Sequence, residues 1–163
     1  MARVESDLEH TGSVQAFLER LAQSVNAGRV QELDGSIARE AVAMFPDSPP
    51  AYGRKAILEL LSHWMWAYRH YVHYDLRHLS SAGPLCYADG TFTLRSARMP
   101  SGSVRVHCGS FLFVLRHGTE AESNAAESNL ADSSAAESSV AGGWSLLRAS
   151  VNSTMPRATR GSL

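Results

Sequence analysis

The sequence predicts an α+β domain in which a cone-shaped, curved antiparallel sheet packs against about three helices. Residues 104–116 are rich in β-branched and aromatic side chains, which suit a pleated, half-buried surface. Residues 142–156 form a second such segment and are their expected antiparallel partner. The segments before them alternate between helical and strand periodicity. The N-terminal part must therefore supply the layer that covers the inner face of the sheet.

The first helix is predicted to follow Thr11-Gly-Ser13, which offers an N-cap, and residues 1–11 are expected to be a flexible tail. Gly28 is a typical residue to end this helix, because it adopts the left-handed conformation without strain. A second, short helix is predicted over residues 30–37. The apolar residues of the first helix recur at helical spacing: Val14, Phe17, Leu18, Leu21 and Val25.

A short strand is predicted over residues 41–45, and the prolines of residues 46–50 then exclude a central strand because they lack the amide donor. A helix follows over about residues 54–68. Three antiparallel strands are expected next, over residues 71–79, 85–98 and 104–116, with the last strand near the C-terminus.

Residues 118–142 consist largely of four pentads of the type Ala-Glu-Ser-Asn-Ala. Such a segment buries too little apolar surface to offset the entropy of ordering it, so it is expected to be a disordered insert between the last two strands. An expanded hairpin loop without a role is the favoured interpretation, and a partner-binding or lid role is the alternative. The compact domain is predicted over residues 12–156, and residues 157–163 are expected to be a second flexible tail.

Composition excludes several classes of protein. The 163 residues are 44% hydrophobic, which suits one compact domain. Outside the insert, 15 basic residues face 11 acidic ones, but they are scattered along the sequence and predict no nucleic-acid groove. No signal peptide and no membrane-spanning apolar run is recognisable, so a cytoplasmic chain without a membrane partner is expected. Cys86 and Cys108 are expected to be buried thiols.

Several segments together resemble the nuclear-transport-factor-2-like α+β cone, in particular its SnoaL-like and steroid-isomerase-like branch. They are Val25-Asn-Ala-Gly28, residues 45–54, residues 109–116, Gly143-Trp144 and Asn152-Ser153. The resemblance covers about residues 13–156. It implies an apolar pocket between sheet and helices that is open at one end. Isomerases, cyclases, dehydratases, epoxide hydrolases and non-catalytic binding or assembly domains share this fold, so the fold alone does not decide the function.

The steroid-isomerase constellation is absent. Carrying the family pattern onto this sequence puts Leu21 at the tyrosine, Met44 at the general-base aspartate and Gly109 at the second acid. None of these side chains can take a proton or stabilise a dienolate by hydrogen bonding. The arginine with two aspartates of limonene-type epoxide hydrolases is not recognisable either.

His107 is the first acid/base candidate. If Phe111 and Phe113 face inward, the period of two along a strand places His107 inward as well, in an apolar chamber that favours its neutral form. His73 and Asp75 share one face of an earlier strand, and a scytalone-type dehydratase resembles this chain in placing a histidine there. The alternatives are a core or surface role for His107, and an outward position for His73 and Asp75.

Substrate-binding candidates are the large rings at or near the helix over residues 54–68, together with inward residues of the last strands. These are Tyr52, Trp64, Tyr68, Phe111, Phe113 and Val151. Plain packing is the alternative role for the rings. The phase of the family pattern puts Leu147, Ala149 and Val151 inward. It puts the row of Asn152 outward, where the resemblance implies a homodimer interface.

No metal or cofactor is expected. His63, His70, His73 and His78 cluster in sequence without matching a closed ligand pattern, and no glycine-rich phosphate loop occurs. The hypothesis is therefore a cofactor-independent isomerase, cyclase or dehydratase that acts on a small apolar oxygenated molecule. The alternative is a non-catalytic ligand-binding or dimerisation module of the same fold.

Overall fold

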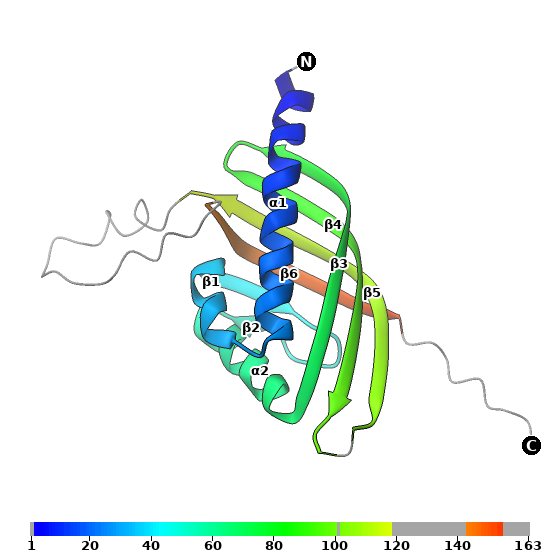
Figure 1. Ribbon diagram of the computed structural model, residues 1–163. Helices are drawn as coiled ribbons and strands as arrows, with labels where there is room; N and C mark the ends of the chain where they lie inside the picture. Colours follow the sequence, from blue (N-terminus) through cyan, green and yellow to red (C-terminus); the bar gives the residue numbers. More distant parts are fainter. Residues whose placement is uncertain (1, 101, 119–142, 155–163) are drawn as a thin grey trace, which may run out of the picture.

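The computed structural model describes residues 2–100, 102–118 and 143–154, and it has the predicted α+β architecture (Figure 1). The helices are α1 (Ala2–Asn26), the 3-10 helix η1 (Val30–Ser36) and α2 (Arg54–Ala67). The strands are β1 (Ile37–Met44), β2 (Ala51–Tyr52), β3 (Tyr68–Ala82), β4 (Leu85–Arg98), β5 (Val104–His117) and β6 (Trp144–Thr154). The predicted insert over residues 118–142 lies outside the described residues except for Gly118, and the predicted tail at 157–163 lies wholly outside them.

The six strands form one sheet in the order β2-β1-β6-β5-β4-β3. The three long strands β3, β4 and β5 curve together, and α1 lies across one face of the sheet (Figure 1). We call this the inner face and the opposite one the outer face. Apolar residues of α1, η1, α2 and the inner face form one core. Among its largest fully buried side chains are Trp144, Phe17, Leu18, Leu33, Ile37 and Ile57.

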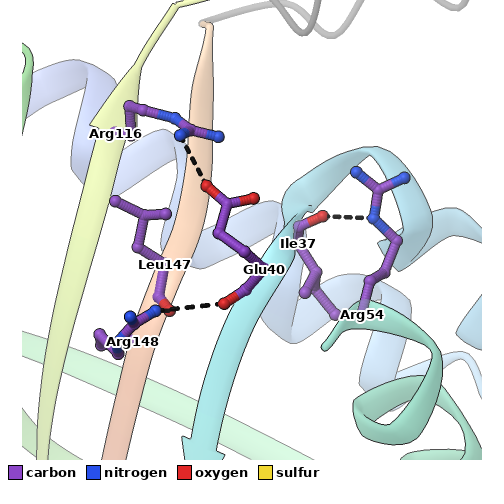
Figure 2. A network of polar contacts seen from close by, with 6 residues as sticks. All are labelled: Ile37, Glu40, Arg54, Arg116, Leu147 and Arg148. Carbon is purple, nitrogen blue, oxygen red and sulfur yellow. Dashed lines mark hydrogen bonds and ion pairs between the residues drawn. The ribbon is translucent and has the colours of Figure 1, made fainter. Parts of the chain in front are cut away.

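The sheet is mixed rather than purely antiparallel, which corrects the prediction. β6 runs antiparallel to β5 but parallel to β1, with a register shift between Ile37 and Val42. Side-chain contacts at Glu40 link β1 to both β5 and β6 (Figure 2). The carboxylate of Glu40 accepts a hydrogen bond from Arg116 of β5 at 2.7 Å, and Arg148 of β6 donates to the carbonyl of Glu40 at 3.3 Å. Local sequence patterns did not indicate this pairing, because it joins segments more than one hundred residues apart.

Helix α1 begins at Ala2, so the residues predicted as a flexible tail at 1–11 are helical from Ala2 on. Ser13 does not cap the helix. Its hydroxyl donates to the carbonyl of His10 at 2.9 Å and accepts a hydrogen bond from the indole of Trp144 at 3.0 Å. The ring of His10 also meets that indole edge-on, with centroids 5.2 Å apart. Contacts with β6 therefore hold this part of the helix, although the sequence predicted the helix to begin only at Ser13.

Two other boundaries differ from the prediction. The short second helix is a 3-10 helix that ends at Ser36, and β1 begins at once at Ile37. Strand β3 begins at Tyr68, three residues before the predicted start, because its first residues pair with the end of β4 from Tyr68 and Arg98 onward. Within the described residues, no helix has the length and apolar character needed to cross a membrane.

The two cysteines differ in their surroundings. Cys86 is buried on β4, as predicted, but Cys108 is exposed on β5, so its predicted burial is wrong. The physical reason is strand parity, because Cys108 alternates with the inward-facing His107 and Gly109 and therefore points to the outer face.

Candidate functional site

The inner face carries the predicted row of β5 side chains. Phe111 and Phe113 are buried there, and His107 is half-buried on the same face, as strand parity predicts. His107 lies opposite Leu94 of β4. Because β6 ends at Thr154, which pairs with Cys108, His107 lies just beyond the end of that strand. It therefore sits at the end of the inner face where β3 begins, which we call the basal end.

An aromatic cluster fills the middle of the inner face. Tyr74 of β3 meets Phe111 and Phe113 edge-on, with centroids 5.3 and 5.7 Å apart. The two phenylalanine rings are 4.7 Å apart. Such edge-to-face contacts add to the stabilisation that burying the rings provides. This cluster forms an apolar wall next to the row of His107.

The hydroxyl groups near this wall differ from ordinary surface hydroxyls. Burial raises the pKa of Tyr74 to about 12, so its O–H stays protonated and can donate a hydrogen bond at neutral pH. The hydroxyl oxygen of Ser153 on β6 is buried and has no hydrogen-bond partner among the described residues. A buried hydroxyl without a partner is costly, and a bound polar atom would relieve that cost.

His70 is held in one tautomer at the basal end. Its Nε2 lies 3.3 Å from the carbonyl of Trp64, which can only accept, so Nε2 carries the proton. Its Nδ1 then accepts from the hydroxyl of Ser96, 2.9 Å away. Burial lowers the pKa of His70, the hydrogen bond to Trp64 opposes that shift, and the nearby His107 lowers the pKa further. The His70 imidazole is therefore neutral at pH 7.

Tertiary structure places His73 and Asp75 on the outer face, not in the interior. They share a face, as predicted, but both are exposed, and Asp75 forms an ion pair with Arg77 at 2.9 Å. Val72 is buried and Tyr74 and Leu76 are half-buried on the inner face, so the odd-numbered residues of the first half of this strand, before its register shift after Leu76, point outward. His73 and His107 therefore lie on opposite faces and cannot act on one bound molecule inside the cone.

The other predicted binding residues divide into two groups. Phe111, Phe113 and the half-buried Val151 face inward, with Val151 opposite Phe111. Trp64 is half-buried and meets Phe45 edge-on at 4.9 Å, and Tyr68 contacts the ring of His70 at 5.9 Å. Tyr52 is 71% exposed, so its predicted place in the pocket is wrong. It pairs with Val42 beside the buried Ala41 and Ala43, and it therefore points away from the core.

Comparison with solved structures identifies the fold of this chain. No family model and no curated protein matches the sequence. Solved structures do match. A nuclear transport factor 2-like superfamily protein from Salmonella enterica is 12% identical, covering 92% of this chain and 94% of its own, with a TM-score of 0.65. The chain has the nuclear transport factor 2-like fold.

Two further solved structures are similar to this chain in fold. A ketosteroid isomerase-like protein from Erwinia carotovora is 16% identical over 87% of this chain and 97% of its own, with a TM-score of 0.63. A proposed scytalone dehydratase from Novosphingobium aromaticivorans is 11% identical over 93% and 89%, with a TM-score of 0.70. At these identities the likeness shows the nuclear transport factor 2-like fold, and the site has to be argued from this chain's own residues.

Sequence reasoning missed His70, Tyr74 and Ser96 as inner-face residues of this nuclear transport factor 2-like sheet. A signal for the first two was present, because Val72 and Leu76 are the aliphatic residues of that strand and share its parity. A signal for Ser96 was present as well, because Phe92 and Leu94 of its own strand share its parity, but its hydrogen bond to His70 follows only from the pairing of the two strands. Within the described ranges, no group of three or more His, Cys, Asp or Glu side chains is placed to hold a metal ion.

The neutral His70 predicts a pH-dependent stability for this nuclear transport factor 2-like domain. Its pKa is lower in the folded chain than the ordinary 6.5, so the unfolded chain binds more protons below that pH. The contribution of His70 is therefore fully present above pH 6.5 and is lost as the pH falls toward the lowered pKa.

We expect urea unfolding to give a smaller loss of stability between pH 7.5 and 5.5 for His70→Gln than for the unchanged chain. His63→Gln, at an exposed position of α2, is the matched control and should keep the original pH dependence. An identical slope in the His70 variant would contradict the assignment.

Proposed function

We propose that the chain is a cytoplasmic, cofactor-independent SnoaL-like enzyme that catalyses a proton transfer on a small apolar oxygenated molecule. The reaction class is that of isomerases, cyclases and dehydratases. The observation that carries the proposal is the position of His107, which lies half-buried on the inner face, in the row next to that of Tyr74 and Phe92. A titratable group in such a place is a candidate for acid/base chemistry.

The proposed division of labour follows from the donors and acceptors on this face. His107 takes a proton from a carbon next to a carbonyl and returns it to the product. The protonated hydroxyl of Tyr74 donates a hydrogen bond to the carbonyl oxygen as negative charge develops there. The buried rings of Phe111 and Phe113 keep this part of the inner face apolar, which suits an apolar molecule. Each proton removed goes to His107, so the step needs no oxidant, reductant or metal.

The test is exchange of the α-protons of an enolisable apolar ketone, 2-tetralone, in heavy water. The folded chain is expected to accelerate deuterium incorporation, measured by proton NMR, beyond the rate with an equal concentration of free imidazole. A rate equal to that of free imidazole would contradict the proposal. Binding of the ketone without any acceleration would instead favour the non-catalytic ligand-binding module.

A second candidate function is self-association through the outer face, and apolar residues there favour it. Met44, Leu112 and Tyr87 are exposed to 48%, 47% and 45%. They lie on adjacent rows, because Met44 and Leu112 both pair with Ser150, and Tyr87 pairs with Val114. Exposed apolar side chains that adjoin across strands are typical of an interface.

We expect light scattering to give about twice the mass of a single chain, and Leu112→Glu to give a single-chain mass. Thr93→Glu on the same face, opposite Cys108 and two rows away from Leu112, is the matched control and should remain dimeric. A single-chain mass for the unchanged protein would exclude this interface.

A further inference from the structure

Arginines that are scattered in the sequence come together at the basal end of the sheet. Arg69 lies on β3, Arg95 and Arg98 on β4, and Arg105 on β5, and all four side chains are exposed. The strand segments that carry them, residues 68–73 and 93–109, contain no Asp or Glu. None of the four forms an ion pair with another described residue. This end of the sheet therefore carries a concentrated, uncompensated positive charge.

The register shows how two of these arginines share one hollow. In one row of the outer face, Arg69 of β3 pairs with Ala97 of β4, which pairs with Val104 of β5. In the next row, Tyr71 pairs with Arg95, which pairs with Val106. Arg69 and Arg95 are thus diagonal neighbours, whose side chains start about 7–8 Å apart. The small side chain of Ala97 leaves room between them.

A groove occupies that position. Its volume is about 320 Å³, and it is lined by Arg69, His70, Tyr71, Arg95, Ala97 and Val104. Tyr71 and Val104 are 60% and 57% exposed, so an apolar rim accompanies the two guanidinium groups. The volume is close to the lower limit of small-molecule sites, about 300 Å³.

We propose that this groove binds a small organic anion, a carboxylate or phosphate group carried on an aromatic body. Two guanidinium groups without ion-pair partners can both donate to one oxyanion, and arginine matches the planar geometry of such groups. The ring of Tyr71 and the side chain of Val104 would cover the aromatic body. Its two arginines are on the opposite face from His107, so the proposed anion site does not use the group of the proposed proton transfer.

The experiment is calorimetric titration of the full chain with phenyl phosphate, benzoate and inorganic phosphate at low ionic strength. Phenyl phosphate or benzoate is expected to bind more tightly than inorganic phosphate, and the stronger of the two identifies the anionic group. Arg69→Gln and Arg95→Gln should each weaken that binding on the order of tenfold, since each removes a charged hydrogen bond. Tyr71→Ala should weaken the aromatic anions and leave inorganic phosphate unchanged.

Arg77→Gln is the matched control. Arg77 lies on the same strand and the same face but is ion-paired with Asp75, so its variant should change the affinity by less than about twofold. Equal weakening by Arg77→Gln, or no binding of any of the three anions, would overturn the proposal. Changes in the amide chemical shifts of Ala97 and Val104 on addition of phenyl phosphate to the unchanged chain give a second readout. Unchanged shifts at saturating phenyl phosphate would also overturn the proposal. His107→Ala should bind the anion normally, which separates this site from the proposed function.

Discussion

Replacing His107 with alanine is expected to abolish the accelerated proton exchange of 2-tetralone while leaving the melting temperature nearly unchanged. General acid–base catalysis by one positioned side chain contributes on the order of 10²–10⁴-fold to a rate, so the loss should approach the whole enhancement. The effect on stability should be small because His107 is only half-buried, at the end of the sheet beyond β6.

His63→Ala is the matched control for this variant. His63 is an exposed histidine of α2, and its removal should leave the exchange rate unchanged. A His107 variant that keeps its activity but loses much stability would assign this side chain to packing. Comparing the exchange rates and the melting curves of the two variants decides between the roles.

Replacing Gly109 with alanine is expected to prevent folding. A Cβ atom at this position would lie 1.8 Å from the carbonyl oxygen of Asn152 and 2.8 Å from the ring of Phe92. Real Cβ atoms essentially never come so close, and the first obstacle is backbone of the paired strand β6, which cannot move without breaking the β5–β6 ladder. The cost should exceed about 4 kcal/mol, a large part of the stability of a domain of this size.

Gly12→Ala is the control that isolates this steric effect. Gly12 lies inside α1, and a Cβ atom added there would have no neighbouring atom within 4 Å, so alanine meets no obstacle. It should raise the free energy of unfolding by about 1 kcal/mol, because alanine favours helix more than glycine does. Urea unfolding of the two variants measures both effects. A folded Gly109 variant of ordinary stability would contradict the close packing of β5 on β6.

The close approach of the strands at Gly109 also explains why the second acid of the steroid-isomerase pattern is missing from this chain. The steroid-isomerase pattern puts an acid where this chain has Gly109, and the structure leaves no room there for a side chain of any kind. Gly90 on β4 is similar, since a Cβ there would lie 2.0 Å from the carbonyl of Asp75. The curved strands therefore pack closely at two glycines, and the acid could not be restored by a single substitution.

Part of the site could be predicted because its signal is local. Phe111 and Phe113 are strongly apolar residues at alternate positions, so they mark the inner side of β5 and place His107 by parity. For β3 the signal was weaker. Tyrosine and histidine occur on both sides of that strand, and the residues that decide the question, Val72 and Leu76, are few. The prediction for His73 and Asp75 therefore depended on a resemblance, and it chose the wrong face.

The sequence by itself determined the α+β class, the long antiparallel strands and the inward side of β5, because these follow from the spacing of apolar residues along single segments. Only the tertiary structure decided the parallel pairing of β1 with β6, the hydrogen bond between His70 and Ser96, and the gathering of Arg69 and Arg95 around one groove. Each of these depends on which residues of distant strands stand opposite one another. Register across a sheet arises from the packing of whole elements, and no single segment records it.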